Sequence, residues 1–159
     1  MIWVVILIGL GALIGVAVYY KKKENAAVEN GTATKRGHDF FRQIHSFKTK
    51  TASLDEIYQN MDRSALEERR ISSKIDTLAG KVIFQNLAVG GSFIATLKLR
   101  GQEDGLYLYS FLFNEWKAEY CFPSANDELS GNIVLTSIEK AIVALDSEAT
   151  ITREFAKGS

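Results

Sequence analysis

Apolar and polar residues follow three different patterns along this chain. An N-terminal stretch, residues 2–20, is apolar throughout and carries no charge. Behind a polar segment, apolar residues recur every three or four positions, which is typical of amphipathic helices. Further on they alternate with polar residues, which is typical of strands. The pattern predicts an N-terminal helix, a linker and one folded domain.

The first 20 residues are expected to form a transmembrane anchor. Residues 2–20, as a helix with a rise of about 1.5 Å per residue, span roughly 28 Å, close to the ~30 Å hydrocarbon core of a bilayer. Trp3 lies at one end and Tyr19-Tyr20 at the other, where amphipathic rings favour the membrane interface. No basic side chain precedes this stretch and bulky residues follow it, so an uncleaved single-pass anchor is favoured over a signal peptide.

The charges that flank this helix predict its orientation. Lys21, Lys22 and Lys23 follow it directly, whereas at most the terminal amine precedes it. The positive-inside rule then places the C-terminal domain in the cytoplasm. The three lysines are candidate contacts for anionic lipid headgroups, each worth about 1 kcal/mol. An inverted topology with an extracytoplasmic domain is the alternative.

Gly11 and Gly15 form a G-x-x-x-G spacing inside the apolar stretch. Small residues four apart let two membrane helices approach closely, which would support self-association. Glycine is also common in membrane helices without any such role. Both interpretations stay open.

Residues 21–37 are polar, without apolar periodicity, and are expected to form a flexible basic tether. They carry five basic and two acidic side chains, a net charge of 5 − 2 = +3, and residues 38–159 carry 14 − 17 = −3. A mildly acidic domain is a poor match for nucleic acid, which we do not expect as a partner. The expected partners are membrane lipid and either another protein or a second copy of this chain.

The folded domain, 38–159, begins with helical patterns. Apolar residues at helical spacing predict a short helix over 38–48. Ser53 and Glu56 form a capping box, which predicts a second helix running to about residue 68. Residues 69–79 fit a continuing helix and an edge strand equally well.

The centre and end of the domain are expected to be mainly strands. Strands are predicted at 81–87, 93–100 and 106–116, with turns at 89–92 and 101–105. A polar loop is expected at 122–132, a helix at 136–146 after a capping box at Thr136 and Glu139, and a last strand at 149–155. The fold class is α+β, with a mainly antiparallel sheet and the approximate order ααβββαβ.

The long strand at 106–116 carries apolar residues on both faces, which predicts a central strand or one covered by helices. Four aromatic side chains share one of its faces. They are expected either to fill the core or to form a ligand or partner face. These residues are Tyr107, Tyr109, Phe111 and Phe113.

Candidate chemistry is sparse, and no catalytic, metal or cofactor motif is present. His38 and His45 are seven residues apart, too far for an i, i+4 metal pair, and are expected at the surface or its boundary. Cys121 is the one cysteine and is expected to be a half-buried structural thiol. The sequence favours a non-enzymatic binding or assembly module at the membrane, and the alternative is an enzyme that uses Cys121 or a carboxylate cluster.

Overall fold

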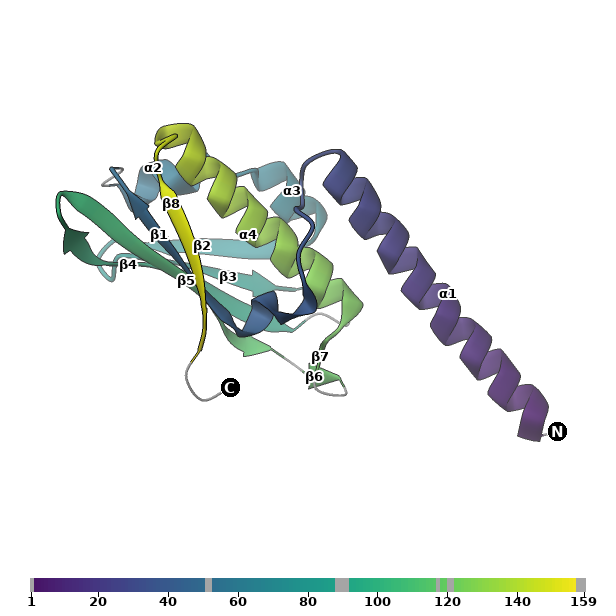
Figure 1. The fold of residues 1–159 in the computed structure, drawn as a ribbon. Coiled ribbons are helices and arrows are strands. Elements are labelled where there is room, and N and C mark those ends of the chain that lie inside the picture. Colours follow the sequence, from purple (N-terminus) through teal and green to yellow (C-terminus); the bar gives the residue numbers. More distant parts are fainter. Residues whose placement is uncertain (1, 51–52, 88–91, 117, 120–121, 157–159) are drawn as a thin grey trace.

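A computed structural model describes residues 2–50, 53–87, 92–116, 118–119 and 122–156 of the chain (Figure 1). Side chains are described from residue 12 onward, except at residue 13 and at the short pairs 118–119 and 122–123. The expected turn at 89–92 lies, apart from Ser92, outside the described residues. The same is true of Cys121.

The domain is built on a six-stranded antiparallel sheet. Its strand order is β2-β3-β4-β5-β1-β8, so β2 and β8 are the edges. The predicted α+β class with a mainly antiparallel sheet is confirmed. The strands are β1 Gln43–Thr49, β2 Ile71–Asp76, β3 Lys81–Asn86, β4 Phe93–Glu103, β5 Leu106–Trp116 and β8 Thr150–Phe155, and the short β6 Ala118–Glu119 and β7 Phe122–Pro123 pair separately.

Helices cover one face of this sheet. The long helix α4 crosses that face, and α2 and α3 pack beside it. The C-terminal part of α1 contacts α4, and its N-terminal part projects away from the domain (Figure 1). The helices are α1 Ile2–Glu29, the 3-10 helix η1 His38–Arg42, α2 Leu54–Gln59, α3 Arg63–Glu68 and α4 Ala125–Leu145.

Aromatic rings form the layer between α4 and the sheet. Phe41 and Phe113 stack with ring centroids 3.8 Å apart, and Phe93 meets Phe113 edge-on at 5.3 Å. Gly131 lets α4 approach this layer, because a Cβ at that position would lie 2.7 Å from the ring of Phe41. The helix therefore rests directly on the rings, at the close packing typical of protein interiors.

The helix predicted at 38–48 is wrong. Phe40 and Phe41 lie in η1, and the chain then extends as β1 between β5 and β8. Inside β1, His45 and Phe47 point to the core, whereas Ile44 is on the opposite face. His45 is buried, but the pattern treats histidine as polar. The remaining apolar residues then have the spacing of a helix.

The second predicted helix is divided in two. The capping box is confirmed in part, since Ser53 Oγ accepts a hydrogen bond from the Glu56 amide at 3.2 Å. The helix then ends at Gln59, and Asp62 caps a separate α3 by accepting from the Ala65 amide at 3.1 Å. Within the undecided segment 69–79, Ile71–Asp76 is the edge strand β2.

The loop predicted at 122–132 is wrong, because α4 already begins at Ala125. Ser124 caps it, and Asp127, in its first turn, is buried and accepts from the Asn86 amide group at 2.8 Å and the Ser92 amide at 3.0 Å. Buried, hydrogen-bonded polar residues thus occupy a stretch whose polarity resembled a loop. The expected cap at Thr136 lies inside the helix.

The hairpin between β4 and β5 is tighter than predicted. β4 continues to Glu103, which leaves Asp104 and Gly105 as a two-residue turn, both with positive φ, 53° and 78°. Asp-Gly with positive φ at both positions is typical of a type I′ turn, whose twist matches the flanking strands. A register shift between Leu99 and Gly101 adds a bulge in β4.

The helix α1 continues beyond Tyr20 to Glu29, so the first part of the predicted tether is helical. Gly31, at φ 79°, ends the helix, and the Ala33 amide donates to the Ala27 carbonyl at 2.9 Å. Within the part of the chain that the structure describes, no helix combines the length and the apolar composition needed to cross a membrane. The division of the chain into anchor, tether and domain stays a prediction.

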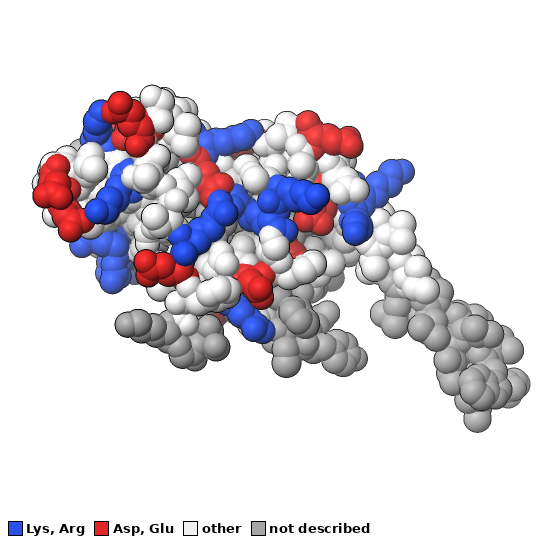
Figure 2. Space-filling view, viewed as in Figure 1, with Lys and Arg blue, Asp and Glu red and all other residues white. Residues whose placement is uncertain are grey.

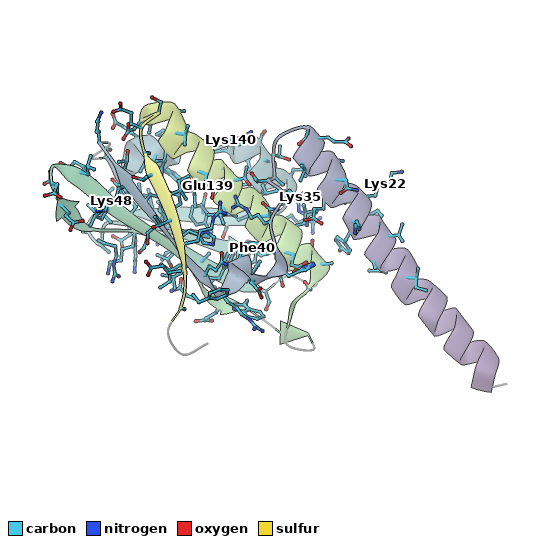
Figure 3. The ribbon with its side chains drawn as sticks, viewed as in Figure 1. Lys22, Lys35, Phe40, Lys48, Glu139 and Lys140 are labelled. Atoms are coloured by element: carbon cyan, nitrogen blue, oxygen red, sulfur yellow. The ribbon has the colours of Figure 1, made fainter. Side chains whose placement is uncertain are left out.

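The segment that follows α1 is held on α4 by buried polar contacts. The Arg36 side chain is 4% exposed and donates to both carboxylate oxygens of Glu139, at 3.1 and 2.5 Å. Its Nε donates to Asn132 Oδ1 at 2.9 Å, and Asn132 in turn donates to the Thr34 carbonyl at 2.7 Å. Lys140 donates to the Gly31 carbonyl. Glu139 and Lys140 lie on α4 near this segment (Figure 3). We call this set of contacts the linker clamp.

Replacing Arg36 with Met should destabilise the domain by about 3 kcal/mol, because Glu139 would stay buried without its main partner. The amides of residues 30–37 should also exchange hydrogen faster. Urea unfolding and hydrogen-exchange mass spectrometry of the full chain in detergent measure both effects.

The matched control is Lys50→Met, which breaks an exposed ion pair with Glu148 and should change neither quantity measurably. The double variant Arg36→Met/Glu139→Met should be less destabilised than the sum of the single changes. Strictly additive effects, or unchanged exchange at 30–37 in Arg36→Met, would contradict the linker clamp.

Candidate functional site

The face of the sheet opposite α4 is the candidate site. Cross-strand partners share a face, so Ile44, Leu112 and Ser110 point away from the core residues Phe47 and Phe111. Among the described residues no helix packs on this outer face. Several of its apolar side chains are only half-buried, namely Ile44, Ile83, Ile94, Leu108 and Leu112.

A hollow of about 630 Å³ lies on this outer face over β4, β5, β1 and β8. Its volume is in the range of small-molecule sites, roughly 300–1,000 Å³. Aliphatic side chains line it together with threonines and a few charges. The outward-facing lining residues are Ile44, Ser46, Lys48, Arg100, Leu108, Ser110, Leu112, Thr150, Thr152 and Glu154. We call this hollow the outer groove.

A second hollow of about 330 Å³ continues from the outer groove. The two share Ile44 and Leu112 as lining residues, and the second extends to Trp116 and Ala156. Together they follow β5 from Leu108 to its end at Trp116. The second hollow is also bordered by Phe41 and Phe113, so it lies where the outer face meets the end of the aromatic core.

Ser110 lines the outer groove with a hydroxyl that has no hydrogen-bond partner in the described structure. Its residue is only 6% exposed. Buried polar groups are nearly always hydrogen-bonded, and an unpaired one costs about 1–3 kcal/mol. A hydroxyl left unpaired at the base of a recess is a group that a ligand can satisfy.

Charges are distributed unevenly along the outer groove. Lys48 and Arg100 lie toward its Leu108 end, and Lys48 is paired with Glu103 at 2.6 Å. Lys48 lies at the end of the sheet that is remote from α1 (Figure 3). No ion pair of Arg100 occurs among the described residues, and Glu154 lies beside Ile44 at the other end.

The aromatic face predicted on β5 lies in the core. Tyr109, Phe111 and Phe113 are buried beneath the helices, and Tyr107 is half-buried at their margin. Burial raises the pKa of Tyr109 to about 12. At these four residues the structure has core packing, and the recess lies on the opposite face of the same strand.

The residues proposed from the N-terminal helix lie on α1. Gly15 is exposed, and a Cβ added there meets nothing within 4 Å, whereas the surroundings of Gly11 fall outside the described side chains. Lys21, Lys22 and Lys23 are exposed, and the Lys23 ammonium lies 4.8 Å from the centre of the Tyr19 ring.

The two histidines have different environments. His38 is exposed and its Nδ1 lies 2.7 Å from Glu128 Oε1, a contact that raises its pKa. His45 is fully buried, so its expected boundary position is wrong. Burial lowers the pKa of His45 to about 4, and its Nε2 must carry the hydrogen because it lies 3.1 Å from the Phe40 carbonyl.

Potential metal ligands are not clustered in the described part of the chain. No group of three or more His, Cys, Asp or Glu residues is close enough there to hold an ion. Asp127 is buried but is used structurally, because its oxygens accept from Asn86 and Ser92. Positive and negative side chains are intermingled on the α4 side of the domain (Figure 2).

The outer groove was not predicted from the sequence. The available signal was the second apolar face of β5, where Leu106, Leu108 and Leu112 alternate with the aromatic residues. Because of that second apolar face, β5 was expected to be a central strand or a strand covered by helices. Comparisons with protein-family models, with curated proteins and with solved structures found no match.

Acid should destabilise the domain through His45. The folded pKa is about 4 and the unfolded value about 6.5, so below pH 6.5 the unfolded chain binds a proton that the folded domain does not. Stability should fall between pH 6.5 and 4, and by pH 5 the loss from this group should be about 2 kcal/mol. Urea unfolding at pH 7 and pH 5 measures it.

His45→Gln keeps an N–H donor but cannot be protonated, so its unfolding free energy should depend less on pH over this range. His38→Gln is the control. The pKa of His38 is raised, so it favours the folded state at low pH, and its removal should not reduce acid sensitivity. Equal pH dependence in His45→Gln and the parent chain would contradict the assignment.

Proposed function

We propose that this protein is a membrane-anchored, non-enzymatic binding module whose ligand occupies the outer groove. The observation that carries this proposal is a half-buried aliphatic face with a buried, unpartnered Ser110 hydroxyl in its floor. Contiguous exposed apolar surface on a soluble domain commonly marks an interaction site. A recess with a few convergent polar groups is the usual form of a small-ligand site.

The membrane part of the proposal is supported by the uncharged stretch 2–20. In this view α1 crosses the bilayer once, and Lys21–Lys23 lie at the cytoplasmic interface near anionic headgroups. A tethered module meets membrane-associated ligands at a high effective concentration. Self-association through Gly11 and Gly15 would bring two such modules together.

The linker clamp supports a defined placement of the domain at the membrane. Arg36 and its partners hold the segment after α1 on α4. This segment is therefore less flexible than an unstructured linker would be. The outer groove lies on the opposite side of the sheet from α4. A ligand in the groove would therefore not displace the contacts that join α1 to the domain.

A reporter that works only in the cytoplasm, fused after Ser159, should be active. The reason is that Lys21–Lys23 keep the C-terminal end of the helix on the cytoplasmic side of the membrane. Replacing these three lysines with Gln should reduce or reverse this orientation. The control replaces Lys48, Lys50 and Lys74, which are far from the helix. These changes should leave the orientation unchanged. Activity of a reporter that works only outside the cytoplasm would contradict the proposed topology.

Photo-crosslinking in living cells tests the groove itself. A benzoylphenylalanine at Leu112 or Thr152 should form a defined adduct, because both positions line the outer groove. Lys74 is the control, since β2 places it on the same sheet face but outside the hollow. Intact mass spectrometry measures adduct mass and yield.

A higher yield at the groove positions than at Lys74, with one recurring mass, is the expected result. Equal yields at all three positions, or no adduct at Leu112 and Thr152, would contradict a binding function for the groove.

A further inference from the structure

We propose that the ligand of the outer groove is an aliphatic chain that ends in a carboxylate. In this arrangement the carboxylate pairs with Arg100 and accepts from the Ser110 hydroxyl, and the chain runs along β5 toward Trp116. This inference rests on the proposed function, and it adds the chemical class and the orientation of the ligand.

The floor of the groove favours an alkyl chain over an extended peptide. β5 lies between β4 and β1, and β1 lies between β5 and β8, so the main-chain groups of both strands are used in the sheet. A peptide brings one N–H and one C=O per residue, and each would lose water without gaining a partner here. An alkyl chain has no such groups, and Ile44 and Leu112, which border both hollows, are chemically matched to it.

The polar groups of the groove favour one anionic end. Arg100 is an exposed guanidinium whose described surroundings contain no ion-pair partner, and it lines the same hollow as Ser110. Guanidinium groups bind carboxylates with strong, charge-assisted hydrogen bonds. Lys48 adds positive charge at this end, although Glu103 pairs with it. An anion is therefore favoured near Arg100 and disfavoured near Glu154.

The neighbouring hollow gives a chain room to continue beyond Leu112. The main hollow and the second one meet at Ile44 and Leu112, and the second continues to Trp116. Leu112 lies two residues beyond Ser110 on the same face of β5. After the register shift between Ile94 and Ala95, Trp116 pairs with the buried Phe93 and contacts the Phe41 ring, so it lies on the core side at the end of the strand. With its carboxylate at Ser110, a chain is directed away from Leu108 and into the second hollow.

Energy transfer from Trp116 tests this arrangement. The probe is 11-(dansylamino)undecanoic acid, which carries a carboxylate at one end and a fluorophore at the other. The full chain with Trp3→Phe, in nanodiscs of zwitterionic phosphatidylcholine, leaves Trp116 as the one donor. Nanodiscs are used because detergent monomers would compete for an amphiphile site. We expect saturable transfer, with the fluorophore near Trp116.

Arg100→Gln should weaken binding of the probe about tenfold, as loss of one charge-assisted contact predicts. Ser110→Ala should weaken it about threefold, as loss of one neutral hydrogen bond predicts. The primary amide of the probe should bind weakly and should be insensitive to Arg100→Gln. Arg70→Gln is the matched control, because Arg70 is exposed at the end of α3 and should leave binding unchanged. Circular dichroism verifies that each variant is folded.

The outcomes separate this inference from the proposed function. If the amide binds as well as the acid, or if Arg100→Gln and Ser110→Ala bind unchanged, carboxylate recognition is wrong. If transfer is not saturable while groove crosslinks form, the aliphatic ligand is wrong and the groove binds another class, such as a peptide, which the adduct mass identifies. If neither transfer nor groove crosslinks occur, both proposals are wrong.

Discussion

The buried ion pair of Arg36 with Glu139 holds the segment after α1 on the domain, beside the direct contacts of α1 with α4. The Arg36 side chain is 4% exposed, its charge is balanced by Glu139, and Asn132 and Thr136 each accept a further hydrogen bond from it. A buried ion pair of this kind adds little net stability, but losing one partner is costly, so the arrangement is specific. Because Asn132 also holds Thr34, the chain reaches η1 and β1 in one defined position.

The same helix that receives Arg36 also decides which face of the sheet is open. α4 lies on the aromatic layer over one face, and its close contact depends on Gly131. With α2 and α3 on that side as well, the opposite face has no helical cover among the described residues. The outer groove is a consequence of this one-sided packing, and the aliphatic residues of β1 and β5 are left half-buried in it.

Patterns that depend on neighbouring residues were predicted well. The Ser53 cap and the strands β3, β4 and β5 are local features, although β4 is longer and the turn after it shorter than predicted. Errors arose where polar residues are buried. His45 made β1 resemble a helix, and Asn126, Asp127 and Ser130 made the start of α4 resemble a loop, because their hydrogen-bond partners are distant in sequence.

The amino-acid sequence alone determined the uncharged N-terminal stretch, the α+β class and the two apolar faces of β5, because composition and period do not depend on distant contacts. It did not determine which face α4 would cover. That choice depends on long-range packing, including Phe41 against Phe113 and Gly131. The tertiary structure therefore decided that the aromatic residues fill the core and that Leu108, Ser110 and Leu112 line a recess.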